Sequence, residues 1–272
     1  MTASSLRTFV IAEAAGCHDG DFRKALRLVD VAADVDADAV KFQWVSSPER
    51  LAARRRASEY LAAYHILAFS PSWHEDLAWR CAAAGIEYMC TVYLQEDIAV
   101  IAPHVQRFKV SSFEAEDVDF VATHFAYWPK PILVSTGMQG ETLGRLFGRV
   151  AARQRAPVAD VRYLHCVSAY PAPLEELCLA VIRRHGLHGL SDHTRHPWTG
   201  ALAVAAGAEI IEFHVRLDDT LPTNADYQVS RSPAEAREYV ANVRLAERML
   251  GDGVKRVMPC EEPMLRYRVT PS

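Results

Sequence analysis

The sequence lacks the features that mark membrane, secreted and nucleic-acid-binding proteins. No apolar run approaches the roughly 20 residues that a membrane-spanning helix needs, and no signal peptide opens the chain. The formal net charge is -4, so the chain has no excess of positive charge from which to build a basic stripe for nucleic acid. We therefore expect a soluble, cytoplasmic protein that binds neither nucleic acid nor a membrane.

Three further absences, of paired cysteines, of a glycine-rich fingerprint and of linker-like segments, exclude further classes of protein. The six cysteines contain no C-x-x-C pair, which in a chain of 272 residues favours free thiols in a reducing compartment. No glycine-rich G-x-G-x-x-G fingerprint follows the first apolar run, which argues against a dinucleotide-binding open sheet. No low-complexity segment divides the chain, so we expect one domain over residues 1–272, with 255–272 as a C-terminal tail.

Short apolar or β-branched runs alternate with helical stretches eight times. Parallel strands require crossover connections, so this alternation predicts a parallel sheet. A length of 272 residues suits a single closed (β/α)₈ TIM barrel, with a doubly wound open sheet as the weaker alternative. The eight predicted strands cover residues 9–14, 39–44, 87–92, 107–112, 131–136, 161–166, 188–193 and 209–215.

Helix signals lie between these runs. The segments "SWHE" (72–75) and "SPAE" (232–235) have the pattern of capping boxes, and Gly85 and Gly251 are placed to end the helices that follow them. One apolar face recurs at three- to four-residue spacing near the start of the chain and predicts a buried helix face, formed by Phe22, Leu26, Val29 and Ala33.

Polar residues interrupt the apolar strands near their carboxyl ends, which is where TIM barrels carry their active sites. Burying a lysine in a strand without a partner costs several kcal/mol. Two lysines, three acids and three histidines at corresponding strand ends are therefore better explained by a shared polar cavity than by separate buried ion pairs. The residues are Glu13, Lys41, Gln43, Thr91, Lys109, Ser111, Ser112, Ser135, Thr136, His165, Asp192, His193, Glu212 and His214.

These residues fall into two chemical groups. Ammonium and hydroxyl groups suit phosphate or carboxylate oxygens and predict an anion site formed by Lys41, Lys109, Thr91, Ser112 and Ser135. Two strands end in a histidine: His193 in "GLSDHT" (189–194) and His214 in "EIIEFHVRLD" (209–218). Together with Glu13 and water, these imidazoles can bind a divalent transition metal. Asp192 and Glu212 are expected to point to the opposite side of their strands and to partner lysines or helix ends.

Several motifs together resemble the sialic acid synthase family, in register from about residue 9 to about residue 262. They are "IAEAAGCHDGD" (11–21), "DAVKFQ" (38–43), "FKVSSFE" (108–114), "LVSTGM" (133–138), "LHCVSAYPAP" (164–173), "GLSDHT" (189–194), "IIEFHV" (210–215) and "RLDDTLP" (216–222). The resemblance implies a synthase that condenses phosphoenolpyruvate (PEP) with an amino-sugar or aldose aldehyde and releases phosphate.

The resemblance also implies roles for individual residues. The metal, Mn²⁺ with Mg²⁺ or Co²⁺ as alternatives, would be held by His193 and His214. PEP would contact Lys41, Thr91, Lys109, Ser112, Ser135, Ser168 and Ser191, and the sugar acceptor would contact Gln43, Glu114, Tyr170 and Asp226. Glu13 would lie near metal-bound water or sugar hydroxyls, and Glu114 would either transfer a proton or bind a hydroxyl. A homodimer is expected, and the alternatives are a metal-dependent pyruvate aldolase or lyase and a non-catalytic sugar-acid-binding relative.

The chain departs from the family pattern beside the expected acceptor site. Cys17, Phe213, Arg216 and Tyr227 stand where the family has other residues, and Cys17 is either a small buried thiol or a third metal ligand. Family members usually continue into an antifreeze-like domain, and an arginine of that domain reaches the sugar of a partner subunit. The 272 residues of this sequence do not include such a domain. We therefore expect an altered acceptor, with N-acetylmannosamine used poorly. The run "ARRRA" (53–57) is either a solvated basic face or, with Arg216, the source of a replacement cation.

Overall fold

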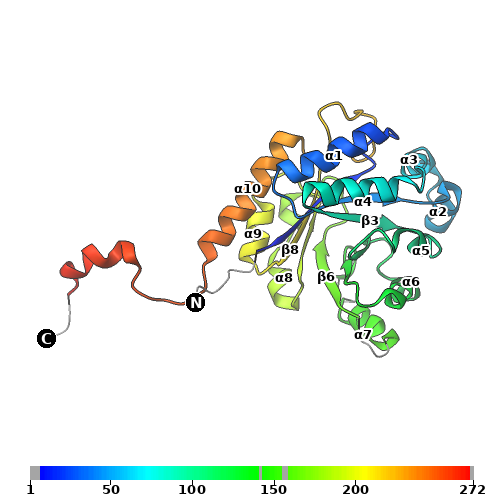
Figure 1. Cartoon of the computed structure of the whole chain (residues 1–272). Coiled ribbons are helices and arrows are strands. Elements are labelled where there is room, and N and C mark those ends of the chain that lie inside the picture. Colours follow the sequence, from blue (N-terminus) through cyan, green and yellow to red (C-terminus); the bar gives the residue numbers. More distant parts are fainter. Residues whose placement is uncertain (1–6, 141–142, 155–158, 270–272) are drawn as a thin grey trace.

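The chain forms a closed parallel β-barrel with helices on its outer surface, as the alternation predicted (Figure 1). The computed structural model describes residues 7–140, 143–154 and 159–269. Neighbouring strands pair in sequence order, and β8 returns to pair with β1. The strands are β1 (Phe9–Ala15), β2 (Ala39–Trp44), β3 (Glu87–Val92), β4 (Phe108–Val110), β5 (Ile132–Ser135), β6 (Val161–Cys166), β7 (Gly189–Asp192) and β8 (Ile210–His214).

Ten α-helices and four short 3₁₀-helices connect the strands or follow them in the described part of the chain. The α-helices are α1 (Phe22–Asp34), α2 (Pro48–Arg55), α3 (Leu61–Leu67), α4 (Trp73–Ala84), α5 (Asp97–Ile101), α6 (Val118–Thr123), α7 (Leu143–Arg153), α8 (Ala180–His185), α9 (Thr199–Ala205) and α10 (Pro233–Leu250). The 3₁₀-helices are η1 (Ser58–Tyr60), η2 (His124–Tyr127), η4 (Leu174–Glu176) and η5 (Pro259–Tyr267).

The predicted strand positions are confirmed, and one boundary differs by more than a residue. Strand β4 ends at Val110 because the backbone turns there, and the amide of Glu114 donates a hydrogen bond to the carbonyl of Ser111. The turn takes Glu114 out of the strand direction, to a position where it lines the cavity.

The helix signals gave mixed results. Ser232 and Glu235 form the predicted capping box at α10, and Gly85 ends α4 in the left-handed conformation. The box at Ser72 is wrong: this residue has helical φ and ψ angles, and its hydroxyl lies 2.9 Å from that of Ser70 without capping α4. The buried face of α1 is rotated from the predicted one and consists of Ala25, Leu28, Val29 and Ala32. Of the four predicted residues only Val29 is fully buried, and the other three are half-buried.

Two consecutive layers of side chains fill the barrel and decide where chemistry is possible. Strand residues alternate between the barrel interior and the surrounding helices, so inward positions recur every second residue. The lower layer is apolar and closes the barrel with Ile11, Ala39, Met89, Leu133, Leu164 and Ile210. Two residues further along their strands, the inward positions are nearly all polar: Glu13, Lys41, Thr91, Lys109, Ser135, Cys166, Ser191 and Glu212.

Three predicted strand-end residues do not line the barrel cavity, and one of them, Thr136, donates a hydrogen bond to the carbonyl of Leu164 at 2.9 Å. The other two lie on the outer side of their strands. Asp192 accepts hydrogen bonds from Tyr239 of α10 (2.8 Å) and from Arg231, which precedes that helix (3.1 Å), as its expected position on the opposite side of the strand requires. His165 also faces outward, and its Nε2 lies 2.6 Å from the carbonyl of Leu177. Both side chains attach strands to the outer shell and take no part in the cavity.

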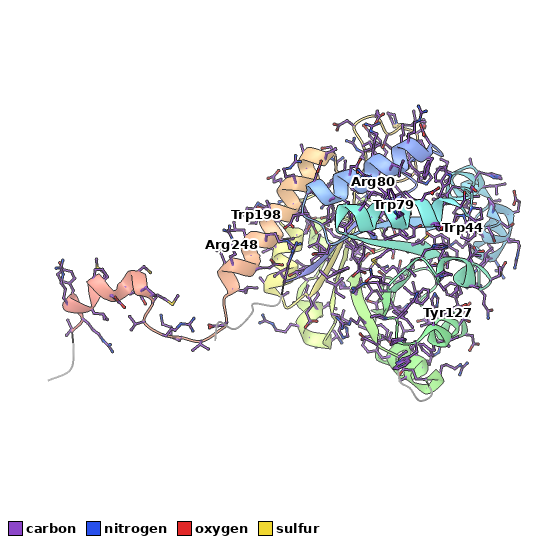
Figure 2. The ribbon with its side chains drawn as sticks, viewed as in Figure 1. Trp44, Trp79, Arg80, Tyr127, Trp198 and Arg248 are labelled. Atoms are coloured by element: carbon purple, nitrogen blue, oxygen red, sulfur yellow. The ribbon has the colours of Figure 1, made fainter. Side chains whose placement is uncertain are left out.

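The segment after α10 leaves the barrel and ends in η5, with its side chains exposed along the described residues 254–269 (Figures 1 and 2). The last residues of the expected tail, 270–272, lie outside the described residues. All six cysteines are free thiols, as predicted. No helix in the described ranges is long and apolar enough to cross a bilayer.

Candidate active site

A cavity of about 850 Å³ opens at the carboxyl ends of the strands. It collects thirteen of the fourteen residues that the sequence analysis assigned to substrates, metal or catalysis: Glu13, Lys41, Gln43, Thr91, Lys109, Ser112, Glu114, Ser135, Tyr170, Ser191, His193, His214 and Asp226. The fourteenth, Ser168, does not line the cavity, and its hydroxyl lies 2.8 Å from that of Ser112. Ser168 therefore supports a lining residue, while the individual roles remain predictions.

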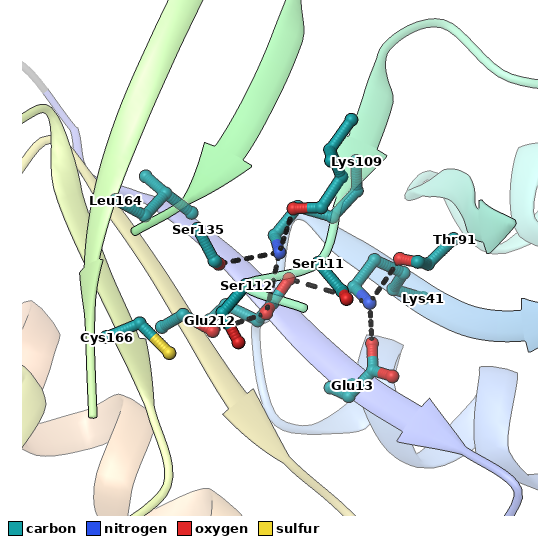
Figure 3. A network of polar contacts seen from close by, with 12 residues as sticks. Glu13, Lys41, Thr91, Lys109, Ser111, Ser112, Ser135, Leu164, Cys166 and Glu212 are labelled. Carbon is teal, nitrogen blue, oxygen red and sulfur yellow. Dashed lines mark hydrogen bonds and ion pairs between the residues drawn. The ribbon is translucent and has the colours of Figure 1, made fainter. Parts of the chain in front are cut away.

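Two buried lysines form the floor of this cavity (Figure 3). Nζ of Lys41 donates to Oγ1 of Thr91 at 2.8 Å and forms an ion pair with Glu13. Nζ of Lys109 donates to Oγ of Ser135 at 2.7 Å and to the carbonyl of Val110 at 3.2 Å. The two ammonium groups thus face one polar layer from neighbouring parts of the barrel wall.

Glu212 lies between the two lysines and corrects the sequence analysis. Its carboxylate oxygens are 3.7 Å from Lys41 and 3.5 Å from Lys109, and Ser191 donates to it at 2.7 Å. We expected Glu212 to point away from the cavity. Because it precedes His214 by two residues, strand alternation puts both side chains on the same, inward side. The expectation that Glu212 partners lysines is confirmed.

Burial and charge pairing act differently on the two lysines. Burial lowers the pKa of Lys41, but Glu13 and Glu212 outweigh it and the net pKa is raised. For Lys109, burial dominates and the net pKa is lowered, despite the favourable charge of Glu212. Burial would raise the pKa of Glu212, yet Lys109 and Lys41 bring it to about 2, so this carboxylate stays ionised.

The two strand-ending histidines lie together on the other side of the cavity. The ring centroids of His193 and His214 are 5.3 Å apart, and Tyr170 lies against His193 with 4.2 Å between centroids. Nδ1 of His193 is 2.7 Å from the carbonyl of Val167, so it serves as the donor and leaves Nε2 as the basic nitrogen. This arrangement answers why two apolar strands end in histidine, since both rings point into one space.

The histidine pair fits a metal with open coordination positions. Buried Nδ1 of His214 has no hydrogen-bond partner, and its nearest carboxylate oxygen, on Asp226, is 3.9 Å away. Burial and His193 hold the pKa of His214 well below its usual value, so this ring is neutral and able to ligate. Within the described residues no group of three or more His, Cys, Asp or Glu side chains is placed to hold a metal. The protein would therefore supply two nitrogen ligands and leave the rest to water or substrate.

Glu114 and Gln43 stand at the mouth of the cavity. Both oxygens of Glu114 accept from Arg55, with distances of 2.8–2.9 Å, and Ser111 adds a further hydrogen bond. Gln43 donates to Glu13 at 2.8 Å and accepts from Tyr93 at 2.5 Å. The mouth is thus a polar network held rigid by residues from β2, α2 and the turns after β3 and β4.

The positions that depart from the family pattern lie mostly away from the cavity. Phe213 is fully buried against Tyr239, with ring centroids 4.7 Å apart, on the outer side of β8. The guanidinium of Arg216 lies over the ring of Tyr227 at 4.4 Å, and neither residue lines the cavity. Cys17 is buried beside Ser230 (3.5 Å), which matches a small buried thiol and not a third metal ligand. None of these four side chains therefore lines the cavity.

Other lining residues were missed or left open by the sequence. The run 53–57 is not simply a solvated face, because Arg55 lines the cavity with a side chain only 18% exposed. Tyr64, Tyr93 and Phe113 surround Arg55 and carried no signal in the sequence beyond being aromatic. Cys166 could have been found by alternation, since it follows inward Leu164 by two residues on β6.

Comparison with known proteins agrees with this geometry. The NeuB family model matches residues 28–255. The N,N'-diacetyllegionaminic acid synthase of Legionella pneumophila is 32% identical over 96% of this chain and 78% of its own length. The human N-acetylneuraminate-9-phosphate synthase is 30% identical over 93% of this chain and 74% of its own. The N-acetylneuraminic acid synthetase structure from Leptospira borgpetersenii, in complex with citrate, superposes with a TM-score of 0.85 at 26% identity, covering 98% of this chain and 93% of that one. The chain therefore belongs to the NeuB family and is an enzyme of the synthase type.

Proposed function

We propose that this enzyme condenses PEP with a sugar aldehyde, releases inorganic phosphate and yields a 2-keto-3-deoxy sugar acid of the nonulosonic type. The observation that carries the proposal is one cavity in which two buried lysines face a pair of histidines. The ammonium groups would neutralise the charge of PEP, and the imidazoles would hold a divalent metal for the second substrate.

PEP would occupy the floor of the cavity. Lys41 and Lys109 offer charge-assisted hydrogen bonds to phosphate or carboxylate oxygens, which are about twice as strong as neutral ones. Hydroxyl groups complete this site, from Thr91, Ser112, Ser135 and Ser191, with Ser168 positioning Ser112. The surrounding groups are fixed before PEP arrives, so they stabilise developing charge without reorganising.

His193 and His214 would hold the divalent metal, which we propose is Mn²⁺, with Mg²⁺ or Co²⁺ as alternatives. When bound, such an ion supplies Lewis acidity to the carbonyl oxygen of the acceptor aldehyde. Val167 keeps His193 in the tautomer that leaves Nε2 free, and Tyr170 shields the same ring from solvent.

The acceptor would lie between the histidines and the mouth, beside Gln43, Glu114, Tyr170 and Asp226. Both oxygens of Glu114 are engaged by Arg55, which favours a fixed hydrogen-bond acceptor for a sugar hydroxyl over a proton-transfer group. Glu13, held by Lys41 and Gln43, is placed to orient a water or hydroxyl near the reacting carbons.

The reaction then follows from these positions. The methylene carbon of PEP forms a bond to the aldehyde carbon, and the aldehyde oxygen takes up a proton. Water adds to the phosphate-bearing carbon, which has become electron-poor, and the tetrahedral adduct expels phosphate to leave a ketone. Lys41 and Lys109 neutralise the phosphate through both steps.

A direct test measures PEP consumption and phosphate release by the purified protein with a panel of aldoses and N-acyl hexosamines, with and without Mn²⁺. We expect both signals to depend on an acceptor and on metal. Consumption of pyruvate instead of PEP would favour the aldolase or lyase, and no turnover with any acceptor would favour a non-catalytic binding protein. The homodimer, the cytoplasmic location and poor use of N-acetylmannosamine remain predictions.

The names of two relatives differ in whether the product carries a phosphate. The human relative is named for a phosphorylated product, whereas the Legionella relative is named for a product without phosphate. Family membership alone therefore leaves open whether this enzyme takes a phosphorylated or an uncharged sugar.

A further inference from the structure

The arginines at the mouth of the cavity are already paired with carboxylates. Arg54 and Arg55, from α2, supply the guanidinium groups that line the described cavity. Arg55 binds Glu114 through Nε and Nη2 at 2.8–2.9 Å, and Nη2 of Arg54 lies 2.7 Å from Asp117. A bidentate arginine–carboxylate pair is among the stronger polar contacts in proteins, so an incoming anion would have to displace a partner that is already in place.

Arg55 is also held by its surroundings. Its guanidinium carbon lies 4.5 Å from the ring centroid of Tyr93 and 4.9 Å from that of Phe113. Turning toward a ligand would break these cation–π contacts as well as the pair with Glu114. Asp226 adds a further carboxylate to the wall of the mouth, where it accepts from the amide of Gly16 at 3.5 Å.

The floor of the cavity also holds one close lysine–carboxylate pair, between Lys41 and Glu13, but its second cation, Lys109, is paired differently from the mouth arginines. Glu212 is shared by two lysines at 3.5 and 3.7 Å, beyond close hydrogen-bond distance, while Lys109 donates to a hydroxyl and a carbonyl. Hydroxyl groups lie around Lys109, so a phosphate can bind there without displacing a carboxylate that is hydrogen-bonded to this lysine. Within the described lining, the floor therefore suits an anion and the mouth does not.

We propose that the acceptor is an uncharged sugar, because both arginines at the mouth are already paired with carboxylates within the described lining of the cavity, which leaves no unpaired cation there for a phosphate or carboxylate remote from the aldehyde. The inference rests on the proposed function, in which PEP occupies the floor and the acceptor reaches the mouth. A dianionic phosphate there would lie in a partly desolvated space lined by the carboxylates of Glu114, Asp117 and Asp226, and like charges repel in such a space. The neutral oxygen of a hydroxyl or acylamino group can accept from Nη1 of Arg55, which takes no part in the pair with Glu114, without adding negative charge beside these carboxylates.

The experiment compares matched acceptors that differ only in a phosphate. PEP consumption is measured with N-acetylmannosamine against its 6-phosphate and with arabinose against its 5-phosphate. We expect kcat/KM to favour the uncharged member of each pair that is turned over, by about tenfold or more, since tenfold corresponds to roughly 1.4 kcal/mol of discrimination. A preference for the phosphorylated member overturns this inference and leaves the proposed function intact.

A charge-release variant tests the physical cause. In Asp117→Asn, Arg54 loses its charged partner while the amide still caps α6, where Asp117 accepts from the amide of Phe120. We expect the relative efficiency with the phosphorylated acceptor to rise several-fold. The matched control is Asp119→Asn, which frees Arg153 on the outer side of the same segment and should change nothing. Equal effects of the two variants would refute the role of the mouth pairing.

If no acceptor in the panel is turned over, the proposed function fails, and binding decides this inference by itself. Protein loaded with PEP is then titrated calorimetrically with mannose 6-phosphate. We expect no saturable heat for the wild-type protein and saturable binding only for Asp117→Asn. Saturable binding to the wild-type protein that Arg54→Gln or Arg55→Gln abolishes would overturn the inference.

Discussion

Nζ of Lys109 lies 3.5 Å from Oε1 of Glu212, close enough for attraction but without a close hydrogen bond, in a site where the lysine side chain is only 3% exposed. Burial therefore dominates and lowers the pKa of Lys109 below its ordinary value. The same lysine is a proposed PEP ligand, so its proton links pH to substrate affinity.

As the pH is raised, affinity for PEP should begin to fall at a lower pH than it would if Lys109 had the pKa of an ordinary lysine. Below the lowered pKa Lys109 is protonated and binds the anion, and as the pH rises through that pKa the charge and the affinity are lost. Calorimetric titration of PEP across the alkaline range measures this. Lys109→Arg keeps its charge and should bind more weakly but without the same pH dependence. Wild-type affinity that stays constant up to pH 10.5 would contradict the prediction.

Replacing either floor lysine should weaken PEP binding. Lys41→Ala and Lys109→Ala each remove a charge-assisted contact, worth roughly 1.5–3 kcal/mol, so the dissociation constant should rise by about one to two orders of magnitude. Lys255→Ala, in the exposed segment after α10, is the control and should bind PEP normally. Unchanged PEP affinity in both floor variants would remove the lysines from the anion site.

Replacing either histidine of the pair should abolish metal binding and leave the fold intact. His193→Ala and His214→Ala each remove one of only two proposed protein ligands, so bound Mn²⁺, measured by elemental analysis of dialysed protein, should drop to background together with activity. His185→Ala, on the exposed end of α8, should retain both. A circular dichroism spectrum like that of the wild type separates metal loss from unfolding, and full metal content in both variants would refute the assignment.

Three buried histidines should make the fold sensitive to mild acid. Burial lowers the pKa of His18, His74 and His124 to about 4, from about 6.5 in an unfolded chain. Their stabilising effect is complete above pH 6.5 and is lost as the pH falls toward 4, because the unfolded chain takes up protons first. Each contributes up to about 1.4 kcal/mol per pH unit to the free energy of unfolding.

Urea unfolding at several pH values between 4 and 7 measures this slope. His124→Gln should reduce the slope by the share of one histidine, and His185→Gln should leave it unchanged, because His185 is exposed. An identical slope in wild type and His124→Gln would show that other groups cause the acid sensitivity. Buried Nδ1 of His124 bonds two helix carbonyls, so a lower absolute stability of the variant does not affect the comparison of slopes.

Much of this architecture follows from the sequence itself. Eight short apolar runs separated by helical stretches determine a parallel barrel, since parallel strands need crossovers and inward positions recur with a period of two. That period places Lys41, Lys109 and His214 on the inward side without knowledge of any contact. The same rule, applied consistently, would also have placed Glu212 and Cys166 there.

Only the tertiary structure decided which polar groups meet, because pairing depends on side chains from strands and loops far apart in the chain. Nothing local in "ARRRA" shows that Arg55 turns inward to Glu114, since that choice depends on the turn after β4 and on the rings of Tyr93 and Phe113. The outward position of Phe213 and the stacking of Arg216 on Tyr227 are likewise set by packing between elements. The sequence determined the barrel and its reactive end, and three-dimensional charge pairing determined where that end can accept an anion.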